Sequence, residues 1–132
     1  MREAFCSIYQ KMQQKLPLHP LESQIAAVIL SHPEFHHYLQ QAEDALTREF
    51  TAEQGQTNPF LHMGMHIAIR EQVSTDRPAG IKDCYHTLAS RYGELEAEHR
   101  MMECLGAALW TAQRDLQEPD ERQYLECIQQ LL

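Results

Sequence analysis

The sequence predicts an all-α fold, a compact bundle of five or six helices that takes up residues 1–132 as a single domain. Apolar residues recur at the three- and four-residue spacing of helices along most of the chain, whereas no segment shows the period-two alternation of a half-buried strand. The six prolines fall between these periodic segments, where they end one helix or begin the next. A chain of 132 residues is also long enough to bury a core without metal or disulfide support.

The N-terminal third predicts three helices. Residues 5–16 form an amphipathic pattern that ends at two prolines, and residues 21–29 form a second one. A third helix is predicted from residue 33 to about residue 50. Its start is marked by a proline in the first turn and by the spacing of Ser31 and Glu34, which is that of a capping box.

The centre of the chain predicts one helix that differs from the others. Residues 51–57 are polar and predict a loop, and Asn58 followed by proline predicts a helix start. The helix would span about residues 59–73. Over its first ten positions the only polar side chains are His62 and His66. A helix that is apolar nearly all round is typical of the centre of a bundle.

The C-terminal half predicts three more helices. Residues 81–92 follow a loop and end at Gly93, a residue type favoured just after a helix. A long helix over residues 94–114 carries one apolar stripe. A last helix begins near residue 119 and docks through apolar residues spaced by three and four positions.

The charge balance argues against two classes of partner. The chain has 11 Lys and Arg against 19 Asp and Glu, and a formal net charge of −8. Nucleic-acid and anionic membrane surfaces need clustered basic residues, and here the basic residues are scattered among acids. No stretch reaches the roughly 18 to 20 apolar residues of a membrane span. We therefore expect neither nucleic acid nor membrane as a partner, and leave open a homo-oligomer or an unknown protein partner.

The cysteines and the N-terminus favour a cytoplasmic protein. Four cysteines are widely spaced, with no CxxC and no zinc-finger spacing. The first residues contain no long apolar stretch and no cleavage signature. We expect the cysteines to be free thiols in a reducing compartment, buried as small apolar side chains. They are Cys6, Cys84, Cys104 and Cys127.

Three pairs of side chains able to bind metal have the spacing of one helical turn. Residues four apart on a helix lie on one face, so the two members of each pair can point at the same place. Metal sites inside helical bundles use pairs of this kind on facing helices. The pairs are His32 with His36, His62 with His66, and His99 with Glu103.

The leading hypothesis is a metal-binding helical domain that holds a transition metal, iron or zinc. His62, His66 and His99 would be ligands, because imidazole suits both metals. Glu103 would be a ligand or would orient a ligating imidazole, with His32 and His36 as further ligands. The pattern specifies no reaction and no substrate, so enzymatic activity stays open.

Two other interpretations fit the same residues. In the first, the protein is a non-catalytic structural or interaction module, and the histidines are core groups hydrogen-bonded to carboxylates or backbone carbonyls; His99 and Glu103 would then pair with each other. Such partners are needed because a buried polar group without one costs about 1 to 3 kcal/mol. In the second, buried histidines make a pH-responsive switch.

Several segments spread over nearly the whole chain resemble one known family. They include HPEFH (32–36), TNPFLH (57–62), DRPAGI (76–81), EAEH (96–99) and MECLG (102–106). The chain resembles the uncharacterised proteobacterial domain-of-unknown-function family 1841, which has no established activity. The family pattern has a histidine where this chain has Leu95 and a glutamate where it has Ala107. A family site that used those two positions would be altered here. A looser likeness, at the level of architecture only, is to hemerythrin-like and ferritin-like bundles that hold iron.

Overall fold

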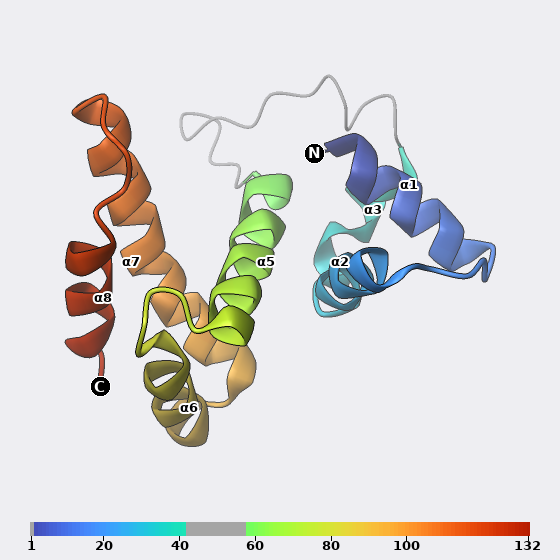
Figure 1. Cartoon of the computed structure of the whole chain (residues 1–132). Helices are drawn as coiled ribbons and strands as arrows, with labels where there is room; N and C mark the ends of the chain where they lie inside the picture. Colours follow the sequence, from blue (N-terminus) through green and yellow to red (C-terminus); the bar gives the residue numbers. More distant parts are fainter. Residues whose placement is uncertain (1, 42–57) are drawn as a thin grey trace. The chain divides into compact units, whose positions relative to one another are not determined.

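The computed structural model describes residues 2–41 and 58–132, and this part of the chain is helical with no strand (Figure 1). The all-α prediction is therefore confirmed for it. The described residues form seven α-helices and one 3-10 helix: α1 (Arg2–Gln13), α2 (Pro20–Leu30), η1 (Pro33–Phe35), α3 (His36–Gln40), α5 (Pro59–Thr75), α6 (Ile81–Tyr92), α7 (Glu94–Arg114) and α8 (Glu121–Gln129).

The predicted helix over residues 33–50 is not a single α-helix. Its start is the 3-10 helix η1, in which the backbone N–H of His36 donates to the carbonyl of Pro33. The short helix α3 follows and ends at Gln40. The rest of the predicted helix and the predicted loop over residues 51–57 lie outside the described residues. The predicted number of five or six helices is accordingly not confirmed.

The chain divides into two compact units, Met1–Ile67 and Ala68–Leu132, and the boundary falls within α5. Besides Pro59 at its start, the buried residues of α5 are Phe60, Met63, His66 and Ile69, spaced by three positions, while Leu61 is 58% exposed. One face of α5 is thus buried rather than its whole circumference, and the prediction of a central helix buried all round is not confirmed. The single-domain assignment of residues 1–132 stays a prediction.

In the first unit, α2 begins at a capping box that the sequence analysis did not identify. The ring Nδ1 of His19 accepts the backbone N–H of Glu22 at 3.4 Å, and Glu22 Oε1 accepts the backbone N–H of His19 at 3.2 Å. Lys11 of α1 donates to Glu22 at 2.6 Å, and this hydrogen bond is the main reason that the pKa of Glu22 is lowered. The cap thereby ties the start of α2 to α1.

The core of the first unit contains side chains from α1, α2, α3 and the first half of α5. Phe5 packs on Phe60 with ring centroids 5.9 Å apart. Val28, Ile29 and Met63 have no exposed surface. The predicted apolar stripes of the first two helices therefore do face a core, and α5 contributes to it through the turn that carries the candidate histidines.

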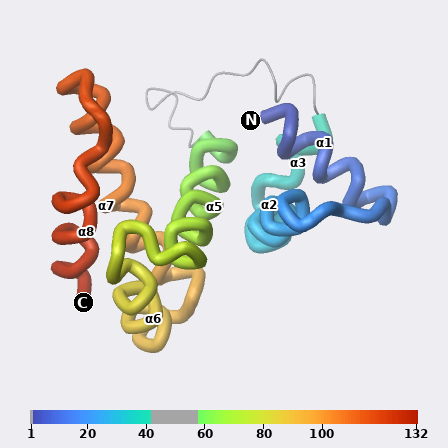
Figure 2. The backbone as a smooth tube through the Cα atoms, in the orientation of Figure 1, coloured from blue at the N-terminus to red at the C-terminus, as the bar shows by residue number. Residues whose placement is uncertain are grey.

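In the second unit, α6, α7 and α8 follow one another along the chain, as the tube in Figure 2 traces. Gly93 lies between α6 and α7 with φ +89°, a conformation that L side chains rarely adopt. The predicted helix end at this residue is confirmed. Asp120 caps α8 by accepting the backbone N–H groups of Arg122 and Gln123.

A disulfide joins α7 to α8 in the second unit. Cys104 and Cys127 are bonded, with their Cα atoms 5.8 Å apart, so the expectation of free thiols is wrong for these two. Their separation of 23 residues carried no recognisable spacing, and only the antiparallel return of α8 onto α7 brings them together. Cys6 and Cys84 are free and buried, as expected. Burial raises the pKa of both thiols, which keeps them protonated and unreactive.

A buried tyrosine also holds α8 in the second unit. Tyr124 is 5% exposed and its hydroxyl donates to Gln72 Oε1 at 2.6 Å. Burial raises the pKa of this phenol well above its usual value. The folded protein therefore keeps Tyr124 protonated at a pH at which the unfolded chain would already lose that proton.

Replacing Tyr124 with phenylalanine is expected to cost about 1 to 2 kcal/mol of unfolding free energy, because the Gln72 oxygen loses its donor while the ring still packs. Wild-type stability should fall as the pH rises above about 10, where only the unfolded state releases the phenolic proton. The variant should show a flatter alkaline limb. Urea unfolding from pH 8 to 11 measures both effects, and identical limbs would contradict the assignment.

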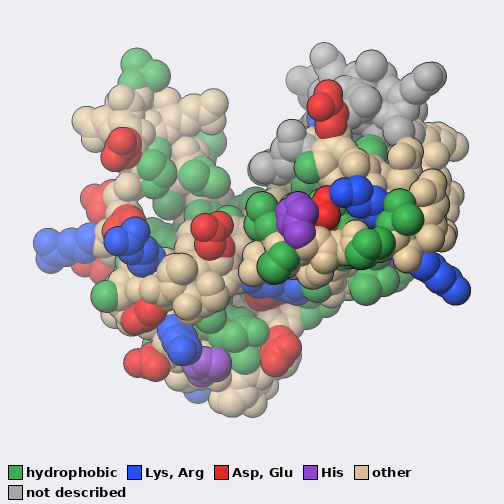
Figure 3. Space-filling model, turned by 45° about the vertical axis from the view of Figure 1, so that its right-hand side comes forward, with side chains coloured by type: hydrophobic (Ala, Val, Ile, Leu, Met, Phe, Trp, Pro, Cys, Tyr) green, Lys and Arg blue, Asp and Glu red, His purple; other side chains and the backbone are tan. Residues whose placement is uncertain are grey.

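The structure gives two observations that concern the predicted partners. No helix among the described residues is long and apolar enough to cross a membrane. On the face shown in Figure 3, acidic and basic side chains lie among one another. The expectations of no nucleic-acid partner and of a cytoplasmic location stay predictions.

Candidate metal centre

The first half of α5 carries two of the predicted ligands. Asn58 begins this helix, since its side-chain oxygen accepts the backbone N–H groups of Phe60 and Leu61 at 3.0 and 3.2 Å. Pro59 occupies the first helical position, as predicted. His62 and His66 then lie one turn apart on the same face. The local sequence thus sets the register that aligns the two rings.

The rings of His62 and His66 meet through their Nε2 atoms, which are 3.2 Å apart. A hydrogen bond between two neutral imidazoles requires one Nε2 to carry a proton and the other to present its lone pair. His66 has no exposed surface. Two imidazole nitrogens are therefore already directed at each other from adjoining turns of one helix.

His32 supplies a third imidazole from the junction between α2 and η1. It is 2% exposed, and its Nδ1 lies 2.8 Å from the carbonyl oxygen of Val28. A carbonyl can only accept, so Nδ1 carries the proton, and Nε2 of the neutral ring is the nitrogen with the lone pair. A backbone carbonyl on one nitrogen is the usual partner that orients a histidine for ligation through the other.

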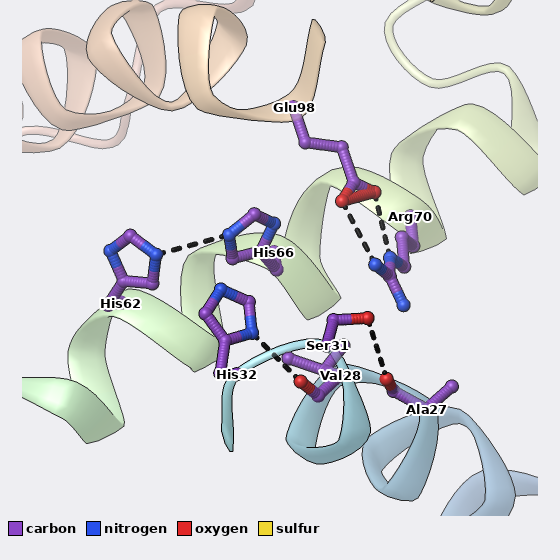
Figure 4. A network of polar contacts seen from close by, with 8 residues as sticks. All are labelled: Ala27, Val28, Ser31, His32, His62, His66, Arg70 and Glu98. Carbon is purple, nitrogen blue, oxygen red and sulfur yellow. Dashed lines mark hydrogen bonds and ion pairs between the residues drawn. The ribbon is translucent and has the colours of Figure 1, made fainter. Parts of the chain in front are cut away.

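Three imidazoles of the first unit, those of His32, His62 and His66, converge (Figure 4). Ring centroids are 5.0 Å apart for His32 and His62, 4.6 Å for His32 and His66, and 4.9 Å for His62 and His66. Each ring offers one nitrogen, and these nitrogens lie within 4.8 Å of one another. Two nitrogens on a tetrahedral zinc ion would be about 3.3 Å apart, given Zn–N bonds near 2.0 to 2.1 Å. The 3.2 Å between the two α5 nitrogens already matches that spacing.

An aromatic ring covers part of this histidine cluster, which we define as His32, His62 and His66. Phe35 stacks on His32 with centroids 5.6 Å apart and planes 3° from parallel. It also meets the ring of His62 edge-on at 5.6 Å. These contacts restrict both rings to the orientations that bring their nitrogens together. The sequence analysis did not single out Phe35, although it lies three positions after His32.

His36 does not belong to the cluster as it stands in the structure. Its Nε2 lies 2.8 Å from the carbonyl oxygen of Ile29, which makes that nitrogen a donor. Its ring packs on Tyr9 with centroids 5.2 Å apart. The predicted pairing of His32 with His36 on one helical face fails because the 3-10 turn η1 separates the two residues.

The two other predicted residues lie on α7 in the second unit. His99 is partly buried and its Nδ1 lies 3.7 Å from a carboxylate oxygen of Glu96. The Glu103 side chain is exposed. The carboxylate beside His99 is thus Glu96, one turn toward the N-terminus, rather than Glu103. Leu95, where the family pattern has histidine, is 38% exposed.

The second unit contains a partly buried ion pair that was not predicted from the sequence. Arg70 of α5 donates through two nitrogens to the carboxylate of Glu98 on α7, at 2.7 and 3.0 Å (Figure 4). Glu98 is 3% exposed. This hydrogen bonding raises the pKa of Arg70. The sequence contains only a weak indication of this ion pair, which is that Arg70 is the first charged residue after the apolar run of α5.

Comparison with known proteins identifies the family. A family model described as Domain of unknown function (DUF1841) matches residues 1–130, and the chain belongs to this family. No curated protein and no solved structure matches the chain. The family description carries no activity, so any function has to be argued from the residues.

Proposed function

We propose that this DUF1841 chain is a metal-binding helical protein whose site is built on the histidine cluster of the first unit. One observation carries the proposal: the Val28 carbonyl fixes the proton of His32 on Nδ1, which leaves Nε2 as the ligating nitrogen of the neutral ring. His62 and His66 then add two Nε2 atoms from adjoining turns of α5. Three neutral imidazoles held in this way suit a divalent transition metal.

Zinc fits the donor set better than iron. Three imidazole nitrogens without a carboxylate are a known zinc ligand set, whereas non-haem iron sites typically combine two histidines with a carboxylate. Such an ion supplies Lewis acidity and lowers the pKa of a bound water when one position stays open. His99 was also predicted from the sequence as a ligand. Its contribution, and that of Glu103, stay predictions.

A second function has support from the same hydrogen bonds. The contacts of His32 with Val28 and of His62 with His66 also satisfy the polar groups of a metal-free core. The chain would then be a structural or interaction module, with the cluster positioning α5 on α2. The two proposals differ in whether a metal competes successfully with these hydrogen bonds.

Metal content of untagged protein, purified without chelator or affinity metal, distinguishes them. We expect close to one zinc per chain in wild type and a loss of at least tenfold in His62→Ala/His66→Ala. A His37→Ala/His86→Ala variant is the matched control, since it removes two exposed histidines and should keep its metal. A His99→Ala variant tests the fourth ligand: weaker retention would support it, and full retention would leave three ligands.

A wild type that is metal-free and cannot be loaded with zinc or iron would overturn the metal proposal and favour the structural module. Equal metal loss in the cluster variant and in the control variant would do the same, because the metal would then be bound non-specifically by surface histidines. Circular dichroism of each variant checks that the helices are intact.

A further inference from the structure

The disulfide of the second unit lies at the edge of a pocket. Cys104 and Cys127 are both among its lining residues, and its volume is about 280 Å³. Cys104 is 2% exposed, whereas Cys127 is partly exposed. A pocket of this size can hold a molecule of a few non-hydrogen atoms beside the disulfide. Cys127 is the more exposed of the two cysteines, which makes it the favoured point of attack.

The wall of this pocket is acidic. Three carboxylates line it, from Asp115, Glu118 and Asp120, and no Lys or Arg is among the described lining residues. Outside the lining, Arg114 pairs with Asp115 at 3.0 Å. Asp120 also caps α8. The remaining net negative charge favours a cation and disfavours an anion in the pocket beside the disulfide.

We propose that Cys104–Cys127 is a thiol–disulfide exchange site that admits small thiols and prefers positively charged thiols over anionic ones. A thiolate attacks Cys127 Sγ, the S–S bond breaks, and Cys104 Sγ leaves as a thiolate that takes a proton from water. A second molecule of the thiol then attacks the mixed disulfide. This second attack releases Cys127 as a thiol and forms the disulfide of the small thiol. The protein disulfide is thereby reduced by two electrons, and the two small thiols are oxidised.

Exchange at this site would control how α8 is held. With the disulfide intact, α8 is tied to α7 covalently and to α5 by the Tyr124–Gln72 hydrogen bond. After reduction only the non-covalent contacts remain. Cys6 and Cys84 should not take part, because both are buried thiols.

The test compares three thiols of similar size and different charge: cysteamine, 2-mercaptoethanol and 2-mercaptoethanesulfonate. The folded, oxidised full-length protein is mixed with each, quenched with an alkylating agent, and the modified cysteines are counted by mass spectrometry. We correct each reduction rate for the thiolate fraction of the thiol and for the dependence of thiolate nucleophilicity on pKa. The corrected rates should fall from cation to anion by about fivefold or more at low salt. In 1 M salt the three rates should converge.

Two variants make the result specific. Asp115→Asn/Glu118→Gln removes lining charge and should narrow the rate differences at low salt, while Cys6→Ser/Cys84→Ser should behave as wild type. The melting temperature of wild type should fall by about 10 °C on reduction, and that of Cys104→Ser/Cys127→Ser should not respond. The proposal is overturned if no disulfide forms with a small cationic oxidant such as cystamine, if the disulfide is reduced only after unfolding, or if the rates do not depend on thiol charge.

Discussion

If the histidine cluster binds zinc as proposed, a chelator is expected to lower the free energy of unfolding by about 4 kcal/mol when zinc is present at about a thousand times its dissociation constant. The reason is mass action: the three imidazoles are assembled only in the folded state, so the ion binds the folded chain and not the unfolded one. The melting temperature should fall by more than 10 °C for a chain of this size. Differential scanning fluorimetry with and without chelator measures the shift.

The variants of the histidine cluster set the controls for this result. His62→Ala/His66→Ala should melt at the same temperature with and without chelator, and His37→Ala/His86→Ala should respond as wild type does. Re-adding zinc should restore the wild-type melting temperature. A wild type that is indifferent both to chelator and to added metal would mean that the histidines serve only as hydrogen-bonded core groups.

Replacing Arg70 with methionine is expected to cost about 3 kcal/mol of unfolding free energy. The carboxylate of Glu98 is 3% exposed, and removing its cationic partner leaves a negative charge in a low-dielectric environment. Glu98→Gln should cost less, about 1 kcal/mol, because the Arg70 side chain is 35% exposed and stays solvated. We expect the Arg70 variant to lose more stability than the Glu98 variant because Glu98 is the more buried of the two partners. Urea unfolding at pH 7 measures both.

An exposed pair on α8 offers the matched control. Arg122 and Glu126 are 89% and 56% exposed, so Arg122→Met should change stability by no more than about 0.5 kcal/mol. The double variant Arg70→Met/Glu98→Leu should recover most of the loss of the single Arg70 variant, since no charge stays buried. A double variant as unstable as Arg70→Met would show that lost packing, not the buried charge, causes the loss of stability.

Much of the fold followed from the sequence because helices leave local signals. The break before Pro20, the cap at Asn58 and the helix end at Gly93 are each encoded within a few residues. The prediction was incomplete at residues 33–40, where the 3-10 helix η1 precedes α3 and the predicted capping box does not form, because Ser31 donates to the Ala27 carbonyl instead. The predicted burial of α5 on all sides is not confirmed, because an apolar composition does not reveal that Leu61 is exposed.

The candidate site divides in the same way. The sequence by itself determined that His62 and His66 share one face of α5, since helical periodicity suffices for that. Only the tertiary structure decided that His32 joins them and that His36 does not, because the 3-10 turn η1 separates the two residues and the carbonyls of Val28 and Ile29 each hold one of the rings. The Arg70–Glu98 ion pair and the Cys104–Cys127 disulfide were decided there too. Their partners are 28 and 23 residues apart along the chain, and nothing local to either partner specifies the helix against which it will pack.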